Sequence, residues 1–260
     1  MIDQLGEGVY RRRYESLDLN IGVVIGEEGV LIVDTRATHA EADELRADLV
    51  TLTKKPVRWV IDTHWHWDHT FGNSRFPGAE IWGHHLCRKA LVDRGESMKE
   101  DAAVWLPDLI TEFEQVVITP PTRVFEDSAG LDLGGVAVTM SYHGLGHTDA
   151  DIVITVGEVG FFGDLVEEGA PPVFDDGYPL SWPGTLQGAL DLGSIRIVPG
   201  HGDVFDQGGA RAQLEEIEAV AMTARRCIDE GLPVGEAARL GPYQEDVMMS
   251  ALNRAVELQL

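Results

Sequence analysis

Apolar segments that alternate with helical patterns in two successive groups constrain the fold of this chain more than any other feature. The first group opens with the runs 21–25 (IGVVI) and 30–34 (VLIVD), which flank a Glu-Glu-Gly turn and predict a β-hairpin. In the next segment, 38–53, Thr38 and Glu41 form a capping box ahead of apolar residues spaced by three and four. This segment is therefore predicted to be a helix.

The rest of the chain repeats this order. Strands are predicted at 57–62, 79–82, 122–126, 136–142, 151–156, 159–163 and 194–198, and helices at 84–94, 97–111, 185–192 and 209–230, with a helical tail to Leu260. Because the strands occur in two groups, each followed by helices, an α/β sandwich is favoured over a doubly wound sheet. No repeat or linker-like segment divides the sequence, so residues 1–260 are expected to form one domain.

Charge limits the expected partners. The chain has 44 acidic and 20 basic residues, a net charge of −24, and such a surface repels nucleic acids and anionic membranes. No apolar run approaches the roughly 20 residues that cross a bilayer, and the N-terminal arginines precede no apolar segment of the secretory type. Cys87 and Cys227 form no CxxC pair and are typical of a reducing compartment. We expect a cytoplasmic protein, and the sequence leaves its oligomeric state open.

The segment 63–69 (THWHWDH) carries the clearest chemical signal. It places an H-x-H-x-D-H pattern directly after the predicted strand 57–62. On extended chain, His64 and His66 point the same way and can bind one ion. Asp68 and His69 follow where the chain bends, and they are directed at a second position. Imidazole and carboxylate ligands without a thiolate suit zinc, iron or manganese.

Three isolated residues follow later strands of the predicted fold. His147 lies in GLGHTD, Asp164 ends VGFFGD, and His201 lies in PGHG. Because α/β proteins collect their active sites beyond the carboxyl ends of strands, we expect these residues to join the 63–69 segment. Neighbouring glycines permit the close approaches that a crowded site needs.

In this order, the residues resemble the pattern of the metallo-β-lactamase-fold hydrolase superfamily, and the likeness covers most of the chain. The matching residues are Asp34 in LIVDT, the 64–69 motif, His147, Asp164 and His201. The resemblance implies a four-layer αβ/βα sandwich. It assigns His64, His66 and His147 to a first metal ion, Asp68, His69 and His201 to a second ion, and Asp164 to a bridging position. Asp34 would brace the loop that carries the ligands.

The bridging Asp164 resembles the glyoxalase II and lactonase branch, since the class B β-lactamases lack this aspartate. The implied activity is that of a binuclear hydrolase with two divalent ions, foremost Zn²⁺, with iron or manganese as alternatives. A hydroxide bridging the ions would attack an ester, thioester, lactone or lactam bond of a small molecule, and Asp68 would orient it and carry its proton. The alternative is a non-haem iron oxidoreductase similar to the persulfide dioxygenases, which use a smaller ligand set.

Aromatic residues near the ligands are candidates for substrate binding. Trp65 and Trp67 alternate with the ligands, so one is expected to line a pocket and the other to pack in the core. The loop 165–184 follows Asp164 and combines aromatic residues with prolines, which suits the wall of an organic substrate site. Its alternative role is that of a surface loop held by its own aromatics. The candidates named for substrate contact are Trp67, Phe174, Tyr178 and Trp182.

The remaining histidines are expected to be structural. His84 and His85 open a predicted helix and are expected to cap it or to face solvent. His143 lies close to His147 in the sequence, so it is either a strand-end residue or a contact of that ligand.

Overall fold

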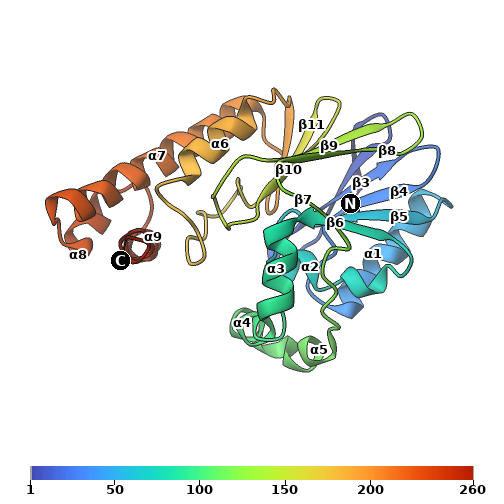
Figure 1. Ribbon diagram of the computed structural model, residues 1–260, viewed down its shortest axis with the longest axis horizontal. Coiled ribbons are helices and arrows are strands. Elements are labelled where there is room, and N and C mark those ends of the chain that lie inside the picture. The colour runs from blue at the N-terminus through green and yellow to red at the C-terminus, as the bar shows by residue number, and fades with distance from the viewer. Residues whose placement is uncertain (1, 260) are drawn as a thin grey trace.

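The computed structural model describes residues 2–259, which form two β-sheets with helices packed outside them (Figure 1). The first sheet follows the sequence order with β1 (Ile2–Gly6), β2 (Val9–Arg13), β3 (Asn20–Ile25), β4 (Val30–Val33), β5 (Val57–Ile61), β6 (Glu80–His84) and β7 (Arg123–Phe125). The second sheet has the order β12 (Arg196–Pro199), β11 (Val159–Gly163), β10 (Ile152–Val156), β9 (Ala137–Tyr142) and β8 (Ser128–Asp132). The predicted α/β fold is confirmed.

Side chains alternate along each strand, so the two faces of each sheet pack into two different hydrophobic cores. In β3 and β4, Val24 and Leu31 pack in the core between the sheets, whereas Val23 and Ile32 pack against α1 (His39–Leu52). The second sheet repeats this division: its inner face joins the core between the sheets, and its outer face packs against α6 (Trp182–Leu190) and α7 (Gln207–Glu230). The result is a helix–sheet–sheet–helix sandwich, as the sequence predicts.

Two further and separate groups of helices lie outside the sheets, one at the centre and lower centre of Figure 1 and one at its left. One contains α2 (Trp67–Thr70), α3 (His85–Arg94), α4 (Met98–Trp105) and α5 (Ile110–Gln115). The other contains α8 (Val234–Ala237) and α9 (Glu245–Glu257), which pack against α7. Across residues 2–259, no helix combines the length and the apolar character required to cross a membrane.

Strand polarity brings the predicted site residues to one edge. In the first sheet β4, β5 and β6 are parallel, so the residues after Val33 and Ile61 leave the sheet on the same side. In the second sheet β11 and β12 are parallel, and β9 runs in the same direction because it is antiparallel to β10. His147, Asp164 and His201 therefore also follow strand ends that share an edge.

The predicted helix-capping residues are found at the start of one helix and at the end of another. The Thr38 side chain accepts a hydrogen bond from the Glu41 N–H at 3.2 Å and begins α1. Helix α7 ends at Gly231, whose φ of 70° gives the left-handed conformation that glycine adopts without strain.

Three strands, one helix and one histidine differ from the prediction. The helix predicted at 97–111 is divided into α4 and α5 by a 3-10 turn at Pro107–Leu109. The strands β1, β2 and β8 were not predicted. The arginines of β2 form ion pairs instead of showing an apolar alternation: Arg12 Nε lies 2.7 Å from Asp48 Oδ2, and Arg13 pairs with Asp18. His84 is the N-cap residue of α3, as predicted, but its side chain makes no capping hydrogen bond and does not face solvent. Its buried ring stacks on Tyr142 and lies within hydrogen-bonding distance of the Glu126 carbonyl.

Candidate metal centre

The 63–69 segment turns from extended chain into helix within its own length. Residues 62–66 continue from β5 without helical hydrogen bonds, and α2 begins at Trp67 with His66 as its N-cap. Extended geometry places His64 and His66 on one side of the chain, and the first turn of α2 then carries Asp68 and His69. The segment thereby presents four side chains to the edge where the second sheet ends.

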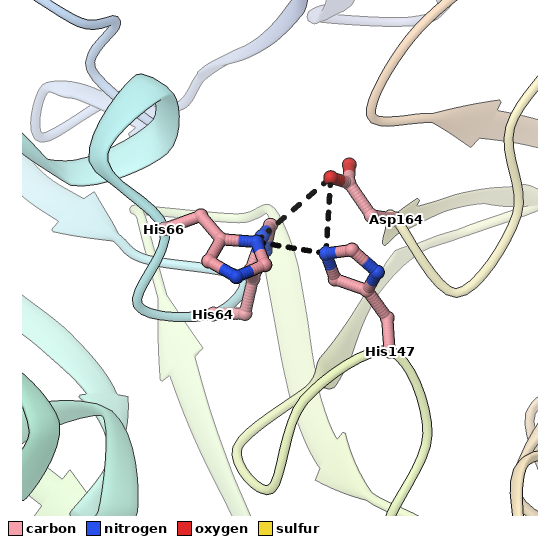
Figure 2. Close-up of side chains that lie close together, drawn as sticks. All are labelled: His64, His66, His147 and Asp164. Atoms are coloured by element: carbon pink, nitrogen blue, oxygen red, sulfur yellow. Dashed lines mark hydrogen bonds and ion pairs between the residues drawn. The ribbon is translucent and has the colours of Figure 1, made fainter. Parts of the chain in front are cut away.

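The first ligand group contains His64, His66, His147 and Asp164, whose ligand atoms all lie within 4.8 Å of one another (Figure 2). His66 Nδ1 lies 3.0 Å from His64 Nε2 and 2.8 Å from His147 Nε2. Asp164 Oδ2 lies 3.6 Å from His64 Nε2 and 3.4 Å from His147 Nε2. Three imidazoles and one carboxylate thus converge on a single point.

The second group contains Asp68, His69 and His201. Asp68 Oδ2 lies 3.4 Å from His69 Nε2 and 3.3 Å from His201 Nε2. Asp164 also reaches this group, because its Oδ1 lies 3.4 Å from His69 Nε2 and its Oδ2 lies 3.5 Å from His201 Nε2. Asp164 therefore lies between the two groups, as the resemblance implies for a bridging ligand.

Each of these imidazoles has a hydrogen-bond acceptor at its outer nitrogen, which fixes its orientation. The acceptors are Thr63 Oγ1 for His64 Nδ1, Asp176 Oδ2 for His66 Nε2, Asp34 Oδ2 for His69 Nδ1, the Val173 carbonyl for His147 Nδ1 and the Leu17 carbonyl for His201 Nδ1. Thr63 accepts here because its hydroxyl donates to Asp34. A proton on each outer nitrogen leaves the inner nitrogen with a lone pair directed at the centre.

The chemistry of the donor set fits bound cations. Among residues 2–259, His69 Nε2 and Asp164 Oδ1 are buried without a hydrogen-bond partner, and both face the centre. Burial, with His66 nearby, lowers the pKa of His147 to about 3 and keeps its ring neutral. Burial also opposes a charge on His69 and His201, yet the Asp164 and Asp68 carboxylates raise the pKa of both well above the usual value. The carboxylates of Asp68 and Asp164 therefore favour a positive charge at the centre, as a cation site requires.

Two buried aspartates hold the turns that carry ligands. Asp34, only 2% exposed, accepts hydrogen bonds from the Thr63 N–H at 2.8 Å and the Thr63 hydroxyl at 2.9 Å, in addition to His69. This agrees with the bracing role expected for Asp34. Asp151 accepts from the Thr148 N–H at 2.8 Å and the Thr148 hydroxyl at 2.6 Å. Asp151 is not among the predicted site residues, although Thr148 and Asp151 stand three residues apart directly after His147.

Close packing at Asp164 depends on a glycine. A Cβ on Gly200 would overlap with Oδ1 of Asp164. Only glycine therefore lets the turn before His201 approach the bridging position. His143 lies elsewhere: its Nε2 is 2.9 Å from Ser141 Oγ, and it is not the acceptor that holds His147.

Three of the four substrate-contact predictions are corrected. Trp67 packs in a buried cluster against Phe113, because α2 begins at this residue and rotates the side chain into the core. Phe174 and Trp182 are buried in the core beneath α7, where their rings lie 5.2 Å apart. These two aromatics hold the 165–184 loop in place, which is the alternative role considered for them. The fourth candidate, Tyr178, lines a surface pocket.

This pocket has a volume of about 250 Å³, and its wall residue Asp176 contacts the ligand His66. Trp65 forms part of its wall, and the Trp65 ring centroid lies 4.4 Å from that of His66. Helix α3, the 165–184 loop and α9 supply the other walls. Of the two tryptophans that alternate with the ligands, Trp65 is therefore the one that lines a pocket.

Comparisons with known proteins agree with this architecture. Residues 17–221 match the family model for the metallo-beta-lactamase superfamily. The 2,4-dinitroanisole O-demethylase subunit beta of Nocardioides sp. (strain JS1661) is 28% identical over 213 residues, which cover 80% of this chain. The chain spans 61% of that relative's length.

Solved structures share the fold at low identity. A metallo-beta-lactamase from Pontibacter korlensis has a TM-score of 0.64 at 20% identity and covers 84% of this chain and 98% of its own. The sec-alkylsulfatase Pisa1 from Pseudomonas sp. has a TM-score of 0.78 at 15% identity, covering 100% of this chain and 50% of its own. The likeness to Pisa1 thus extends to the C-terminal helices beyond residue 221.

Proposed function

Because this chain belongs to the metallo-beta-lactamase superfamily, we propose that it is a hydrolase that binds two divalent cations at the centre described above. His64, His66 and His147 would hold the first cation, and Asp68, His69 and His201 the second. The observation that carries the proposal is the position of Asp164, whose carboxylate lies within 3.4–3.6 Å of imidazole nitrogens from both groups. Zn²⁺ is the metal that we propose first, since the donors are imidazole and carboxylate.

Bound cations at such a site would lower the pKa of a water molecule and polarise the bond under attack. The chain supplies the remaining functions. The outer N–H groups of the five imidazoles each donate a hydrogen bond, and these five bonds hold the ligands in one orientation. Asp68 Oδ2 lies beside the inner nitrogens of His69 and His201 and would hold the second cation with them, which leaves Oδ1 as the atom that we propose to accept a proton from water and deliver it to the leaving group.

The bridging carboxylate supports placement in the glyoxalase II and lactonase-like branch. The proposed substrates are small molecules with an ester, thioester, lactone or lactam bond. An activated aryl methyl ether belongs in the test panel as well, because a relative at 28% identity is a subunit of 2,4-dinitroanisole O-demethylase. The alternative, a one-iron oxidoreductase, needs fewer ligands than the seven side chains that converge here.

Metal analysis and substrate screening test the proposal together. We expect about two zinc ions per chain in the purified protein, and loss of hydrolysis and a lower melting temperature after chelation. One iron per chain with sulfur-oxidising activity would instead establish the alternative. Full hydrolytic activity in a sample verified to be metal-free would refute the metal mechanism.

Substitution of Asp164 tests the bridging role itself. In Asp164→Ala we expect the metal content to fall from about two ions per chain towards one, and hydrolysis to fall at least about a hundredfold. The first group keeps three imidazoles, and β11 keeps its pairing with β10 and β12, so the fold should survive. The Asp164→Asn variant keeps the shape and removes the charge. Two tightly bound ions and near-native rates in both variants would show that Asp164 is not a bridging ligand.

A further inference from the structure

The pocket beside His66 is lined by aromatic, apolar and charged residues that have no role as metal ligands. Its wall residue Asp176 places Oδ2 at 3.3 Å from His66 Nε2, while His66 Nδ1 faces the other ligands. The imidazole ring of His66 therefore lies between this wall residue and the other ligands of the first group. Trp65, Tyr178, Leu86 and Ala90 provide aromatic and apolar wall surface, which suits the body of an organic molecule.

Two arginines of this pocket differ from most others in the chain. In a protein with a net charge of −24, guanidinium groups generally have a carboxylate partner: Arg12 pairs with Asp48 and Arg123 with Glu80, each at 2.7 Å. Arg94, by contrast, comes no closer than 3.9 Å to a carboxylate oxygen, on Asp176, and it makes no hydrogen bond within residues 2–259.

Arg254 has no carboxylate partner among the described residues, whereas Arg94 has only its 3.9 Å contact with Asp176. It donates from Nε to the Gly177 carbonyl at 3.0 Å and from Nη2 to the Asp176 carbonyl at 3.4 Å. Aromatic faces hold both groups: Arg94 lies 4.3 Å from the Trp65 ring centroid, and Arg254 lies 5.6 Å from that of Tyr178. Helices α3 and α9 bring the two arginines from either side of the 165–184 loop (Figure 1).

The acidic residues of the same pocket already have partners. Asp149 accepts the Trp65 indole N–H at 2.9 Å, Asp93 pairs with Lys89 at 2.6 Å, and Asp176 accepts from His66. The donors that remain available are those of the guanidinium groups, foremost Arg94. A planar guanidinium held against an aromatic ring is oriented to bind a carboxylate through two parallel hydrogen bonds.

We propose that this pocket binds a carboxylate group of the substrate, with Arg94 as its main contact and Arg254 beside it. Because three aspartates also line the pocket, a singly charged carboxylate fits better than a dianion such as a phosphate monoester. The inference rests on the proposed function, since it specifies the substrate class of the same centre. That class is a carboxylate-bearing ester, thioester, lactone or lactam whose scissile bond reaches past His66 to the metal ligands.

Binding of benzoate to the metal-reconstituted full chain tests this pocket directly. The readout is the indole N–H resonance of Trp65, assigned with a Trp65→Phe variant, and benzamide serves as the neutral isostere. We expect benzoate to shift this resonance saturably, Arg94→Met to weaken binding at least about tenfold, and benzamide not to bind. Arg88→Met is the matched control, because Arg88 lies on the same helix and bonds to the Pro121 carbonyl outside the pocket. It should bind like the unmodified chain.

Several outcomes would overturn the inference: no saturable shift with benzoate, equal binding of benzamide, or unchanged binding in Arg94→Met. Loss of metal in Arg94→Met would also overturn it, since Arg94 would then act on His66 through Asp176. Hydrolysis of a carboxylate-bearing ester and its neutral methyl ester separates the two proposals. No hydrolysis of any substrate with intact benzoate binding refutes only the proposed function, whereas equal hydrolysis of both esters refutes only the carboxylate site.

Discussion

The two halves of the molecule hold their ligands with the same device, an aspartate that accepts two hydrogen bonds from one threonine. In the first half, Asp34 follows β4 and holds Thr63, the residue before His64. In the second half, Asp151 precedes β10 and holds Thr148, the residue after His147. Both aspartates are buried, and each fixes the turn of one imidazole ligand.

The difference between them lies in the third contact. Asp34 also accepts from the His69 imidazole at 2.8 Å, and its backbone has a φ of 67°, which few residues other than glycine, asparagine and aspartate adopt. Asp151 is not bonded to an imidazole within residues 2–259, and burial raises its pKa to about 7 although Thr148 opposes the shift. The first half thus couples its brace to the metal centre, whereas the second half keeps its brace separate.

Substitution of Asp34 should have the largest effect of the changes that test this comparison. Asp34→Ala leaves two buried Thr63 donors and the His69 ring without their acceptor, so we expect the free energy of unfolding to fall by about 3–5 kcal/mol. Metal affinity should fall about 10- to 100-fold. Denaturant titration and a chelator competition assay measure the two effects.

The Asp34→Asn variant separates the effect on stability from the effect on metal affinity. Its amide oxygen can still accept a hydrogen bond from Thr63, but the variant has no carboxylate beside His69. We expect it to retain most of the stability and still to lose metal affinity. If Asp34→Asn bound metal as tightly as the unmodified chain, the coupling of this brace to the centre would be refuted.

Substitution of Asp151 should have the next largest effect, which is a change in how the free energy of unfolding depends on pH. Its pKa is about 7 in the folded chain and 3.8 in the unfolded chain, so the folded state holds more protons between these values. The stability that this group contributes is therefore fully present below pH 4 and is lost as the pH rises to about 7, by on the order of 4 kcal/mol. Asp151→Asn removes the titration, while the Thr148 hydroxyl can rotate to match the amide.

The measurement is the free energy of unfolding of both metal-free proteins from pH 4 to pH 8. Relative to Asp151→Asn, the unmodified chain should lose stability across this range. A constant difference between the two proteins would show that Asp151 is already ionised at pH 4.

Sequence reasoning identified the side chains that converge, because their order and their positions after strands are visible in the residues. It could not identify the Leu17 and Val173 carbonyls that orient His201 and His147, since every residue carries a carbonyl and only the fold selects one. The assignment of Trp67 to the pocket failed for a related reason. A period of two holds up to His66, and α2 then changes the period to 3.6.

Strand β2 shows the same limit. Its three arginines give no apolar alternation, and each forms an ion pair with an aspartate. Likewise, Asp176 is the acceptor for His66 but lies in a loop rich in proline and glycine, where no period indicates its direction. Ion pairs and braces of this kind depend on contacts between distant segments.

Asp176 should have the smallest effect, and it tests whether burial determines the strength of a brace. Unlike Asp34, Asp176 has a side chain that is 42% exposed and touches its imidazole at 3.3 Å. An Asp176→Asn amide can still accept from His66, so we expect metal affinity to fall by no more than about tenfold. The fold should not change, because Arg254 and Ser250 of α9 hold the loop through Gly177 and Asp175. Asp175→Asn is the matched control and should leave metal affinity unchanged. If Asp176→Asn instead lost as much affinity as Asp34→Asn, exposure would not distinguish the two braces, and the loop would be as much a part of the centre as the first sheet.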